Sequence, residues 1–473
     1  MWFSPEMQRN LWLQLSWSRL LSAPVFASMV LAALLAGLKP QPISLSEGAR
    51  WAFVLIIAFW GTRRVADSLA EELADGTWES QRMSGQGAWS MIWGKMAGGA
   101  AFPWYCALIA LGIMIWYGLR VLPETMRLPL WQQVITLMLG AILALSVSLA
   151  VALLLLRKSH HRRRLSVTLA QVGGLAAFIV ATIGDYSASP WATSSGTISW
   201  FGRVFDSWQF HTVSTAIFVL WSLLACYRLM RAELLYRNHP WLWLLFVAFV
   251  MAYVAGFFLL PVETLSAQLL AACYAGLGLT YLSFFAELKD PVRYRWGLAR
   301  FTALQWWRAL EFTPWWLVAY LMTCGVGAAA IWSVVMGGGF SGENTWWFPW
   351  FQWAHWFAVG SVTYKIAALL LFALRDILFL LWFNFGPMRQ RADVSGFVLL
   401  VFAYGPLAWV VYFSGFSRFL PALVPLAAAN PADLAWPAAE VLAMALLLHL
   451  RWRQTTRVEV VADDREEPSI GAP

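Results

Sequence analysis

Residues 131–156, WQQVITLMLGAILALSVSLAVALLLL, contain no charged side chain and are followed directly by Arg157 and Lys158. A helix crosses the hydrocarbon core of a bilayer with roughly 20 mainly apolar residues. A stretch of this length and composition therefore predicts a membrane-spanning helix that ends at a basic membrane boundary.

The rest of the chain has the same character. Of its 473 residues, 60% are hydrophobic and only 12% are charged, and the mean hydropathy is +0.62. A water-soluble fold could not cover so much apolar area with so few charges. We expect an all-α polytopic membrane protein with about twelve transmembrane helices. The expected spans are residues 21–38, 46–65, 100–119, 131–156, 165–184, 208–229, 241–260, 265–285, 315–336, 353–374, 396–416 and 434–450.

The distribution of basic residues predicts the orientation of these spans. Cytoplasmic loops of membrane proteins carry an excess of Lys and Arg. Placing the N- and C-termini in the cytoplasm puts most of the 33 basic residues in cytoplasmic segments and leaves Lys365 as the basic residue near the middle of a span. The densest cluster, at 157–164, is interpreted as a topology signal, with an anionic-lipid site as the alternative. The net charge of +8 is therefore spread along a membrane surface, and we expect no nucleic-acid partner.

The order of spans and loops predicts two halves, each with about six helices in the same orientation. The halves share this architecture but little residue identity. The tail is polar and acidic and is expected to be disordered and cytoplasmic. The expected segments are an amphipathic in-plane helix at 1–20, a first half at 21–237 with an inside loop at 62–98, a second half at 238–453 with an inside loop at 286–313, and the tail at 454–473.

Within the first inside loop, residues 71–99 (EELADGTWESQRMSGQGAWSMIWGKMAGG) interrupt the apolar chain with charged residues and glycines. The spacing of the apolar residues from Val65 onward predicts that the second span continues into the cytosol as an amphipathic helix. We expect Gly76 to end that helix and Thr77 to cap a second short helix. A third helix is expected to begin at about Ala88.

The dipeptide Gly94-Lys95 invites comparison with a phosphate-binding loop. Trp89 and Met96 occupy the positions where that motif needs Gly and Ser or Thr, so this motif predicts no ATP site in the chain. Gly94 and Gly98 form a small-xxx-small pair, which predicts close helix packing.

The first half resembles the permease subunits of ABC-2 type exporters. The resemblance consists of an amphipathic N-terminal helix, two spans, a Glu followed by Gly-Thr-Trp-Glu, and a Gly-Lys before the third span. In that family the loop docks on a separate ATP-binding cassette ATPase subunit, so the resemblance implies an ATPase-coupling site here. The coupling residues that it implies are Glu71, Gly76, Thr77, Trp78, Glu79, Arg82, Gly94 and Lys95.

The second inside loop departs from this pattern because it lacks Gly-Thr-Trp-Glu. It has the place and the basic character of a second coupling loop, and its candidate residues are Arg293, Arg295 and Arg300. Pro291 is expected to break its helix.

The resemblance implies an exporter permease in the cell membrane, in the bacterial cytoplasmic (inner) membrane, that moves substrate outward. No cofactor is expected in this chain, since ATP and Mg would bind the partner ATPase. Membrane lipid is the other expected partner, and the family leaves room for an accessory periplasmic or membrane protein. A pathway lined by aromatic and small residues suits lipids, hydrophobic peptides and glycans alike, so the sequence leaves the substrate open.

Two other classes of function stay open. A twelve-span ion-coupled secondary transporter would share the plan of two equal halves, although residues 61–69, GTRRVADSL, do not match the signature of the major facilitator class. Its weak candidates for a substrate or ion pathway are Lys365 and Glu440, which could pair or line a path. An integral membrane enzyme would need clustered acids or metal-ligand spacing, whereas the six His are scattered and the four Cys lie inside expected spans.

Overall fold

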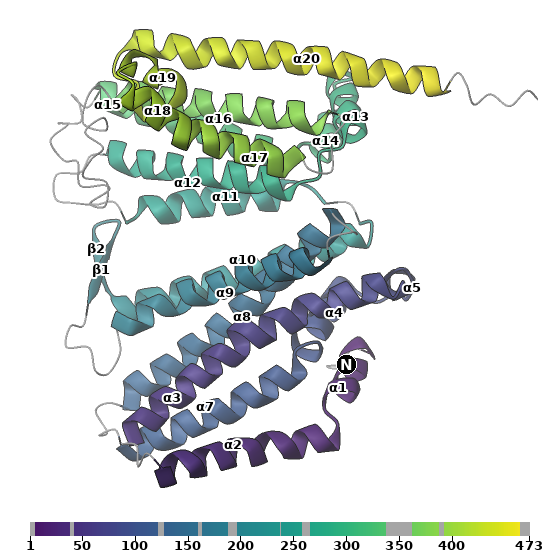
Figure 1. The fold of residues 1–473 in the computed structure, drawn as a ribbon, viewed down its shortest axis with the longest axis vertical. Helices are drawn as coiled ribbons and strands as arrows, with labels where there is room; N and C mark the ends of the chain where they lie inside the picture. The colour runs from purple at the N-terminus through teal and green to yellow at the C-terminus, as the bar shows by residue number, and fades with distance from the viewer. Residues whose placement is uncertain are drawn as a thin grey trace, which may run out of the picture. The chain divides into compact units, whose positions relative to one another are not determined.

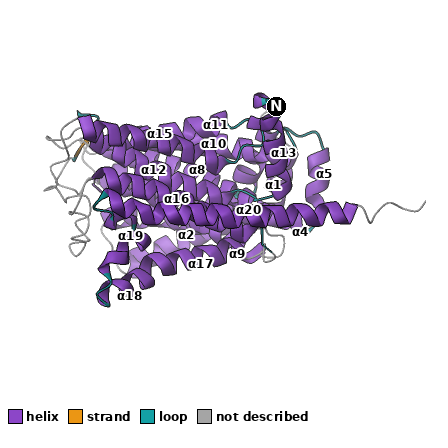
Figure 2. Ribbon diagram, turned by 90° about the horizontal axis from the view of Figure 1, so that it is seen from above, coloured by secondary structure: helices purple, strands orange, loops and turns teal. Residues whose placement is uncertain are grey.

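The computed structural model describes residues 5–37, 42–121, 127–158, 163–187, 196–236, 238–257, 265–336, 362–386 and 392–463. Helices form nearly all of this part of the chain, and its strands make one short hairpin, β1 and β2, which the sequence analysis did not predict (Figure 2).

The expected fold class, an all-α polytopic membrane protein, is confirmed. Within the described residues, nine helices are long and apolar enough to cross a membrane, or up to ten if one bent pair counts as a single span. The nine are Ala101–Arg120, Leu130–Leu155, Arg164–Thr182, Ser207–Glu233, Leu265–Ala286, Trp315–Met336, Val362–Asn384, Ala392–Phe413 and Pro431–Gln454.

The helices group into two compact units, which divide along the chain between Asn238 and His239. Residues 200–202 are the exception, because they belong to unit 2. In unit 1 the long helices run side by side (Figure 1). Its helices are α1 (Pro5–Gln14), α2 (Trp17–Gly37), α3 (Pro42–Leu55), η1 (Ile56–Gly61), α4 (Thr62–Ala74), α5 (Thr77–Met83), α6 (Ala88–Trp93), η2 (Gly94–Gly98), α7 (Ala101–Val121), α8 (Arg127–Lys158), α9 (Arg163–Ser187) and α10 (Ser207–Glu233). The strands β1 (Thr197–Trp200) and β2 (Arg203–Asp206) precede α10.

Unit 2 is a second bundle, in which α16 packs against α12, α15, α17 and α20. Its helices are α11 (Trp241–Ala255), α12 (Leu265–Ala286), α13 (Pro291–Thr302), α14 (Trp306–Leu310), α15 (Trp315–Met336), α16 (Val362–Asn384), α17 (Ala392–Phe402), η6 (Ala403–Leu407), α18 (Ala408–Phe413), η7 (Ser417–Phe419), α19 (Leu420–Leu423), η8 (Pro425–Ala427), η9 (Pro431–Leu434) and α20 (Ala435–Asp463).

Each unit has its own apolar core. In unit 1, Phe53, Ile57, Met114 and Phe178 are buried where α3 and η1 meet α7, α8 and α9. In unit 2, buried side chains of α12, α15 and α16 form a cluster that includes Phe284, Trp316, Ile377 and Leu380.

The second expected span, 46–65, is part of one continuous helical path. The chain keeps helical backbone angles from α3 through the π-helical segment η1 into α4. A π-helical turn widens a helix locally and often lies at a functional site. The path therefore joins a membrane helix directly to the first inside loop.

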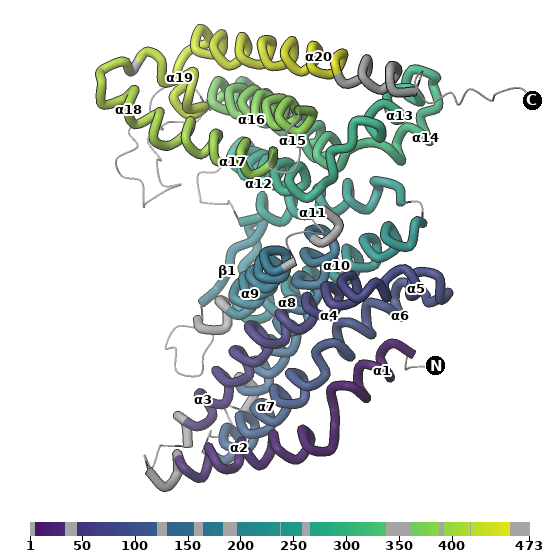
Figure 3. The backbone as a smooth tube through the Cα atoms, turned by 45° about the vertical axis from the view of Figure 1, so that its right-hand side comes forward, coloured from purple at the N-terminus to yellow at the C-terminus, as the bar shows by residue number. Residues whose placement is uncertain are grey.

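Several expected boundaries are wrong. The in-plane helix predicted at 1–20 ends at Gln14, and α1 meets α2 at a bend of 59° (Figure 3). The span predicted at 241–260 is the shorter helix α11. Residues 454–463, predicted to belong to the disordered tail, continue helix α20, whereas 464–473 lie outside the described residues.

The largest correction concerns the span predicted at 353–374. Helix α16 begins at Val362 and runs to Asn384, while residues 337–361 lie outside the described residues. Arg375 and Asp376, which the sequence analysis assigned to a loop, therefore lie inside a membrane-length helix. The rule that charges mark loops failed here because these charges find partners inside the bundle.

Candidate functional site

The first inside loop is a helical hairpin, as the sequence predicts. Helix α4 ends at Ala74, α5 spans Thr77–Met83 and α6 begins at Ala88. Gly76 adopts a φ of 70°, a left-handed conformation that costs a residue with a side chain about 1–2 kcal/mol. Glycine therefore allows the sharp turn between α4 and α5.

Thr77 acts differently from the prediction. The N-cap of α5 is Gly76, and the helix has no side-chain cap hydrogen bond. The Thr77 hydroxyl instead donates to the carbonyl oxygen of Glu72 at 3.3 Å and so closes the end of α4. Thr77 thus ties the turn back to the preceding helix.

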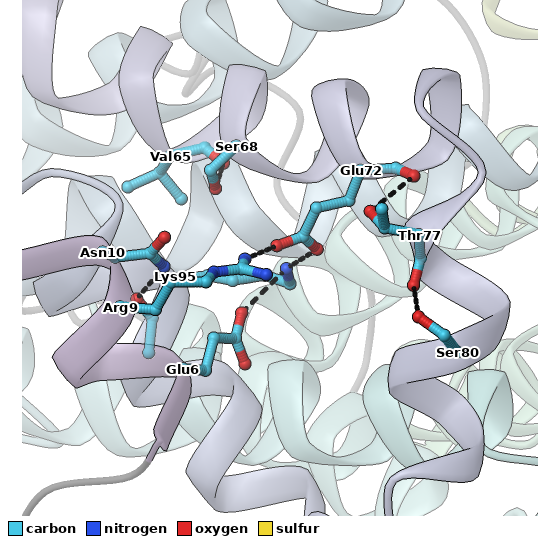
Figure 4. Close-up of polar contacts among 10 residues, drawn as sticks. Glu6, Arg9, Asn10, Val65, Ser68, Glu72, Thr77, Ser80 and Lys95 are labelled. Carbon is cyan, nitrogen blue, oxygen red and sulfur yellow. Dashed lines mark hydrogen bonds and ion pairs between the residues drawn. The ribbon is translucent and has the colours of Figure 1, made fainter. Parts of the chain in front are cut away.

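Lys95 lies at the centre of the site and is 0% exposed. Its Nζ atom lies 3.0 Å from Glu6 Oε1 of α1 and forms an ion pair and hydrogen bond with Glu72 Oε2 of α4. Arg9 Nη2 donates to the other oxygen of Glu72 at 2.8 Å. Figure 4 shows these side chains converging from α1, α4 and η2.

The four charges of this network cancel. Arg9 and Lys95 are positive, whereas Glu6 and Glu72 are negative and buried. A buried charge is tolerated when it is paired, and removing one partner of a buried pair is strongly destabilising. Burial raises the pKa of Glu6 above 4.5, and the nearby Lys95 partly opposes this shift.

Trp78 covers the network. Its side chain is buried, and Lys95 Nζ lies 5.3 Å from the centroid of its ring. A cation over an aromatic ring at this distance gains a favourable interaction. Trp78 therefore holds α5 against Lys95 and does not belong to the exposed surface of the loop.

Helix α1 packs closely on the π-helical segment η2, which confirms the predicted role of the small-xxx-small pair. A Cβ atom at Gly94 would lie 3.0 Å from side-chain carbons of Glu6, and one at Gly98 would lie 2.9 Å from Cβ of Asn10. Asn10 Nδ2 donates to the carbonyl of Gly94 at 3.2 Å, and Gln14 Nε2 donates to the carbonyl of Gly99 at 2.5 Å. The polar side chains of α1 therefore form part of the site.

The exposed surface of the hairpin lies on α5 and at the end of α4. Glu71 and Glu79 are exposed, and Met83 is 81% exposed. Arg82 Nη1 donates to Glu79 Oε1 at 2.9 Å, which keeps the two charged side chains together. Of the residues that the resemblance implies, Glu71, Glu79 and Arg82 lie on this surface beside Met83, whereas the buried Trp78 and Lys95 support it from behind.

The sequence analysis missed Glu6, Arg9 and Glu72 as members of the site. A signal for Glu72 was present, because Val65, Leu69 and Glu72 follow the i, i+4, i+7 spacing of one helical face. A carboxylate on that buried face requires a cation nearby. The partners from α1 are remote in sequence, so no local pattern could identify them.

The second inside loop forms α13 and α14. Pro291 does not break the helix, because it is the first residue of α13 and Asp290 caps the helix by accepting from Val292 N at 3.1 Å. Proline suits this position since its missing N–H would be unpaired anyway.

The three candidate arginines of this loop lie partly against the rest of the protein. Arg293 Nη1 lies 3.7 Å from buried Glu287, and the Arg300 guanidinium carbon lies 4.5 Å from the ring centroid of Phe312. Arg295 is also half-buried. The three residues therefore do not form a basic patch on the surface.

Much of the outer surface of α13 and α14 is apolar, although Arg308 is also exposed. Its exposed large apolar residues are Val292, Trp296, Leu298, Phe301, Leu304, Trp306 and Trp307. Behind it, a cavity of about 620 Å³ lies among α13, α15, α16 and α20, and its lining includes Tyr294, Phe301, Phe312, Trp316, Phe385 and Trp452. Exposed tryptophans on a short helix are typical of the membrane interface.

Lys365 and Glu440, the weak pathway candidates, do not form the pair that the sequence suggested. Glu440 Oε2 accepts from Arg375 Nη1 at 2.6 Å. Lys365 is on the same helix as Arg375, about 15 Å before it along the axis. Among the described residues, no group of three or more His, Cys, Asp or Glu could hold a metal ion.

No family model, curated protein or solved structure matches this chain. The functional argument therefore depends on the geometry of the site itself.

Proposed function

We propose that this chain is the membrane permease of an exporter driven by a separate ATP-binding cassette ATPase, and that α5 with the end of α4 is its docking surface. The observation that carries this proposal is the buried network of Lys95, Glu6 and Glu72 behind an exposed, charged helix. A short helix in a loop would be marginal by itself. Trp78 and Thr77 fix this one to Lys95 of η2 and to Glu72 of α4.

The same network connects the proposed docking surface mechanically to the membrane helices of unit 1. A push on α5 reaches η2 through the contact of Trp78 with Lys95, and it reaches α4 through the hydrogen bond from Thr77 to Glu72. Helix α4 continues through η1 into α3. The push also reaches α1 through Glu6. Movement of the hairpin would thus tilt membrane helices of unit 1, with the wide turn of η1 as the point of bending.

The finer features belong to the same proposal. The chain has about twelve spans in two halves, with both termini in the cytoplasm of a bacterial cell and the spans in its inner membrane. Helices α13 and α14 lie at the lipid interface in this proposal, because most of the large side chains that they expose are apolar. ATP and Mg bind the partner alone.

Ion-coupled secondary transport is the second candidate. It is favoured by one observation, the charged residues Arg375, Asp376 and Glu440 within helices of unit 2. Intramembrane charges of this kind often mark ion pathways.

The test is purification of the tagged chain in mild detergent, followed by measurement of copurifying protein and its ATP hydrolysis. Glu79→Arg and Met83→Asp change the exposed surface of α5, so we expect both to remove the ATPase from the complex. Arg203→Glu reverses an exposed charge on β2 and serves as the control that keeps it. An ATPase retained in fixed ratio by both α5 variants would reject the docking surface, and a chain that purifies alone would favour the second candidate.

A further inference from the structure

The apolar cavity of unit 2 lies where the second inside loop meets the membrane helices. Side chains of α13, α14, α15, α16 and α20 line it, together with the link at 312–314 (Figure 1). Its volume of about 620 Å³ falls within the range of about 300–1,000 Å³ that is typical of ligand sites. The cavity is therefore large enough to hold a ligand.

The cavity is elongated along the membrane helices. Its lining runs from Leu378 to Phe385 on α16 and from Ala445 to Trp452 on α20. At 1.5 Å per residue, each stretch is about 10 Å long along its helix. Membrane helices are tilted by only about 20° on average from the bilayer normal, so the cavity runs in nearly the same direction as the lipid chains around it. This shape suits an extended hydrocarbon chain.

The cavity opens on the apolar surface of the second inside loop. Leu298 and Phe301 of α13 line it and are also 56% and 51% exposed. On the other side, Ala445 and His449 of α20 line it and are exposed. Helix α20 buries little of its surface in the protein. A lipid beside α13 and α20 therefore has direct access to the cavity.

Two arginines lie next to the lining. The Arg300 guanidinium carbon is 4.5 Å from the ring centroid of Phe312, which lines the cavity. A Cβ atom at Gly386, which follows the lining residue Phe385, would lie 2.9 Å from Arg451 Nη2. A guanidinium beside an aromatic ring keeps the N–H groups in its plane for a phosphate. The pair of arginines therefore suits an anionic head group next to an apolar chain.

Acidic residues of this region leave the two arginines unneutralised. Glu287 lies 3.7 Å from Arg293, and Asp393 Oδ1 lies 2.7 Å from Lys289 Nζ. Glu311 adjoins the link at 312–314, but within the described part of the chain it forms no ion pair with either arginine. Both positive charges are therefore available to a ligand.

We propose that this cavity binds one acyl chain of an anionic phospholipid, with Arg300 and Arg451 beside the lipid phosphate. Basic pockets between membrane helices bind the head groups of anionic lipids. The bound chain contacts α13, α16 and α20 at once and so attaches the second inside loop to the bundle. This site is separate from the proposed docking surface and does not depend on the ATPase.

The experiment is native mass spectrometry of the purified full-length chain in detergent. Phosphatidylglycerol and phosphatidylcholine with identical acyl chains are titrated in separate samples. We expect wild type to bind one phosphatidylglycerol more tightly than phosphatidylcholine.

The charge of the site is tested with Arg300→Gln and Arg451→Gln. Each should weaken phosphatidylglycerol binding about fivefold, which is the effect of one cation on an anionic lipid. Phosphatidylcholine binding should stay unchanged, which shows that the cavity is intact. The matched control is Arg418→Gln, because Arg418 is exposed on η7 and does not line the cavity.

The apolar part is tested with Ala445→Trp, which places a large ring in the cavity and should weaken the binding of both lipids. The matched control is Ala443→Trp, because Ala443 is exposed on the same helix but does not line the cavity. This control should bind both lipids as wild type does.

Three results would overturn the proposal. Equal affinity of wild type for the two lipids would reject recognition of the phosphate by the arginines. Wild-type binding by Ala445→Trp would place the lipid elsewhere. A dimer without bound lipid that Ala445→Trp dissociates would assign the cavity to a second copy of the chain.

Discussion

Replacing Lys95 with Met tests whether the buried network holds the docking hairpin in place. The change keeps most of the side-chain volume but leaves Glu6 and Glu72 buried with Arg9 as the remaining cation of the network. Breaking a buried ion pair by removing one partner costs about 3–5 kcal/mol. Since each 1.4 kcal/mol is a factor of about ten, the local opening of α1 and α5 should become about 10²- to 4 × 10³-fold more frequent.

The assay is amide hydrogen exchange of the chain in detergent, which measures local opening element by element. We expect faster exchange in α1, in the last turn of α4 and in α5, with no change in α16. The double variant Lys95→Met, Glu6→Gln leaves Arg9 paired with Glu72 and should recover much of the lost protection. Unchanged exchange in Lys95→Met, or no recovery in the double variant, would refute the proposed role of the network.

Three further outcomes follow from the site. Because burial raises the pKa of Glu6 above 4.5, the folded site binds a proton at Glu6 more tightly than the unfolded chain does. Part of the stability of docked α1 is therefore fully present below pH 4.5 and is lost as pH rises through the folded pKa, although the ion pair with Lys95 offsets some of that loss. A spin label at exposed Trp12 should report this change, and Glu6→Gln should abolish it. Gly98→Ala should separate α1 from η2, because the added Cβ would lie 2.9 Å from Cβ of Asn10. Faster amide exchange confined to α1 would show this separation, and an unchanged exchange rate in α1 would contradict it. Gly76→Ala should destabilise the α4–α5 turn by about 1–2 kcal/mol, because residue 76 has a φ of 70°. Amide exchange at 75–78 should become faster. Gly87 has an extended backbone, so Gly87→Ala should leave the exchange rate unchanged.

Local chemistry made much of unit 1 predictable. The turn at Gly76, the second helix up to Met83 and the start of α6 near Ala88 all follow from residues next to one another in sequence. The close packing at Gly94 and Gly98 was also predictable, although the partner helix was not. That partner, α1, is brought there by the tertiary fold.

The charged residues show where sequence reasoning failed. Lys95 is part of a Gly-Lys motif that suggested a surface, yet it is entirely buried, because Glu6 and Glu72 reach it from remote segments. Arg375 and Asp376 were assigned to a loop because their charges would be costly in a membrane by themselves. Tyr281, Tyr404 and Glu440 offset that cost, and no local pattern reveals such partners.

The most direct test of the central claim is a photo-crosslinker placed at Met83 on α5, with the chain at its native level in living cells. The matched control is the same crosslinker at Met336, which is 65% exposed at the end of α15. The account predicts a crosslink from Met83, and none from Met336, to a protein that mass spectrometry identifies as an ATP-binding cassette ATPase. A crosslink from Met83 only to lipid or to another copy of the chain would contradict it.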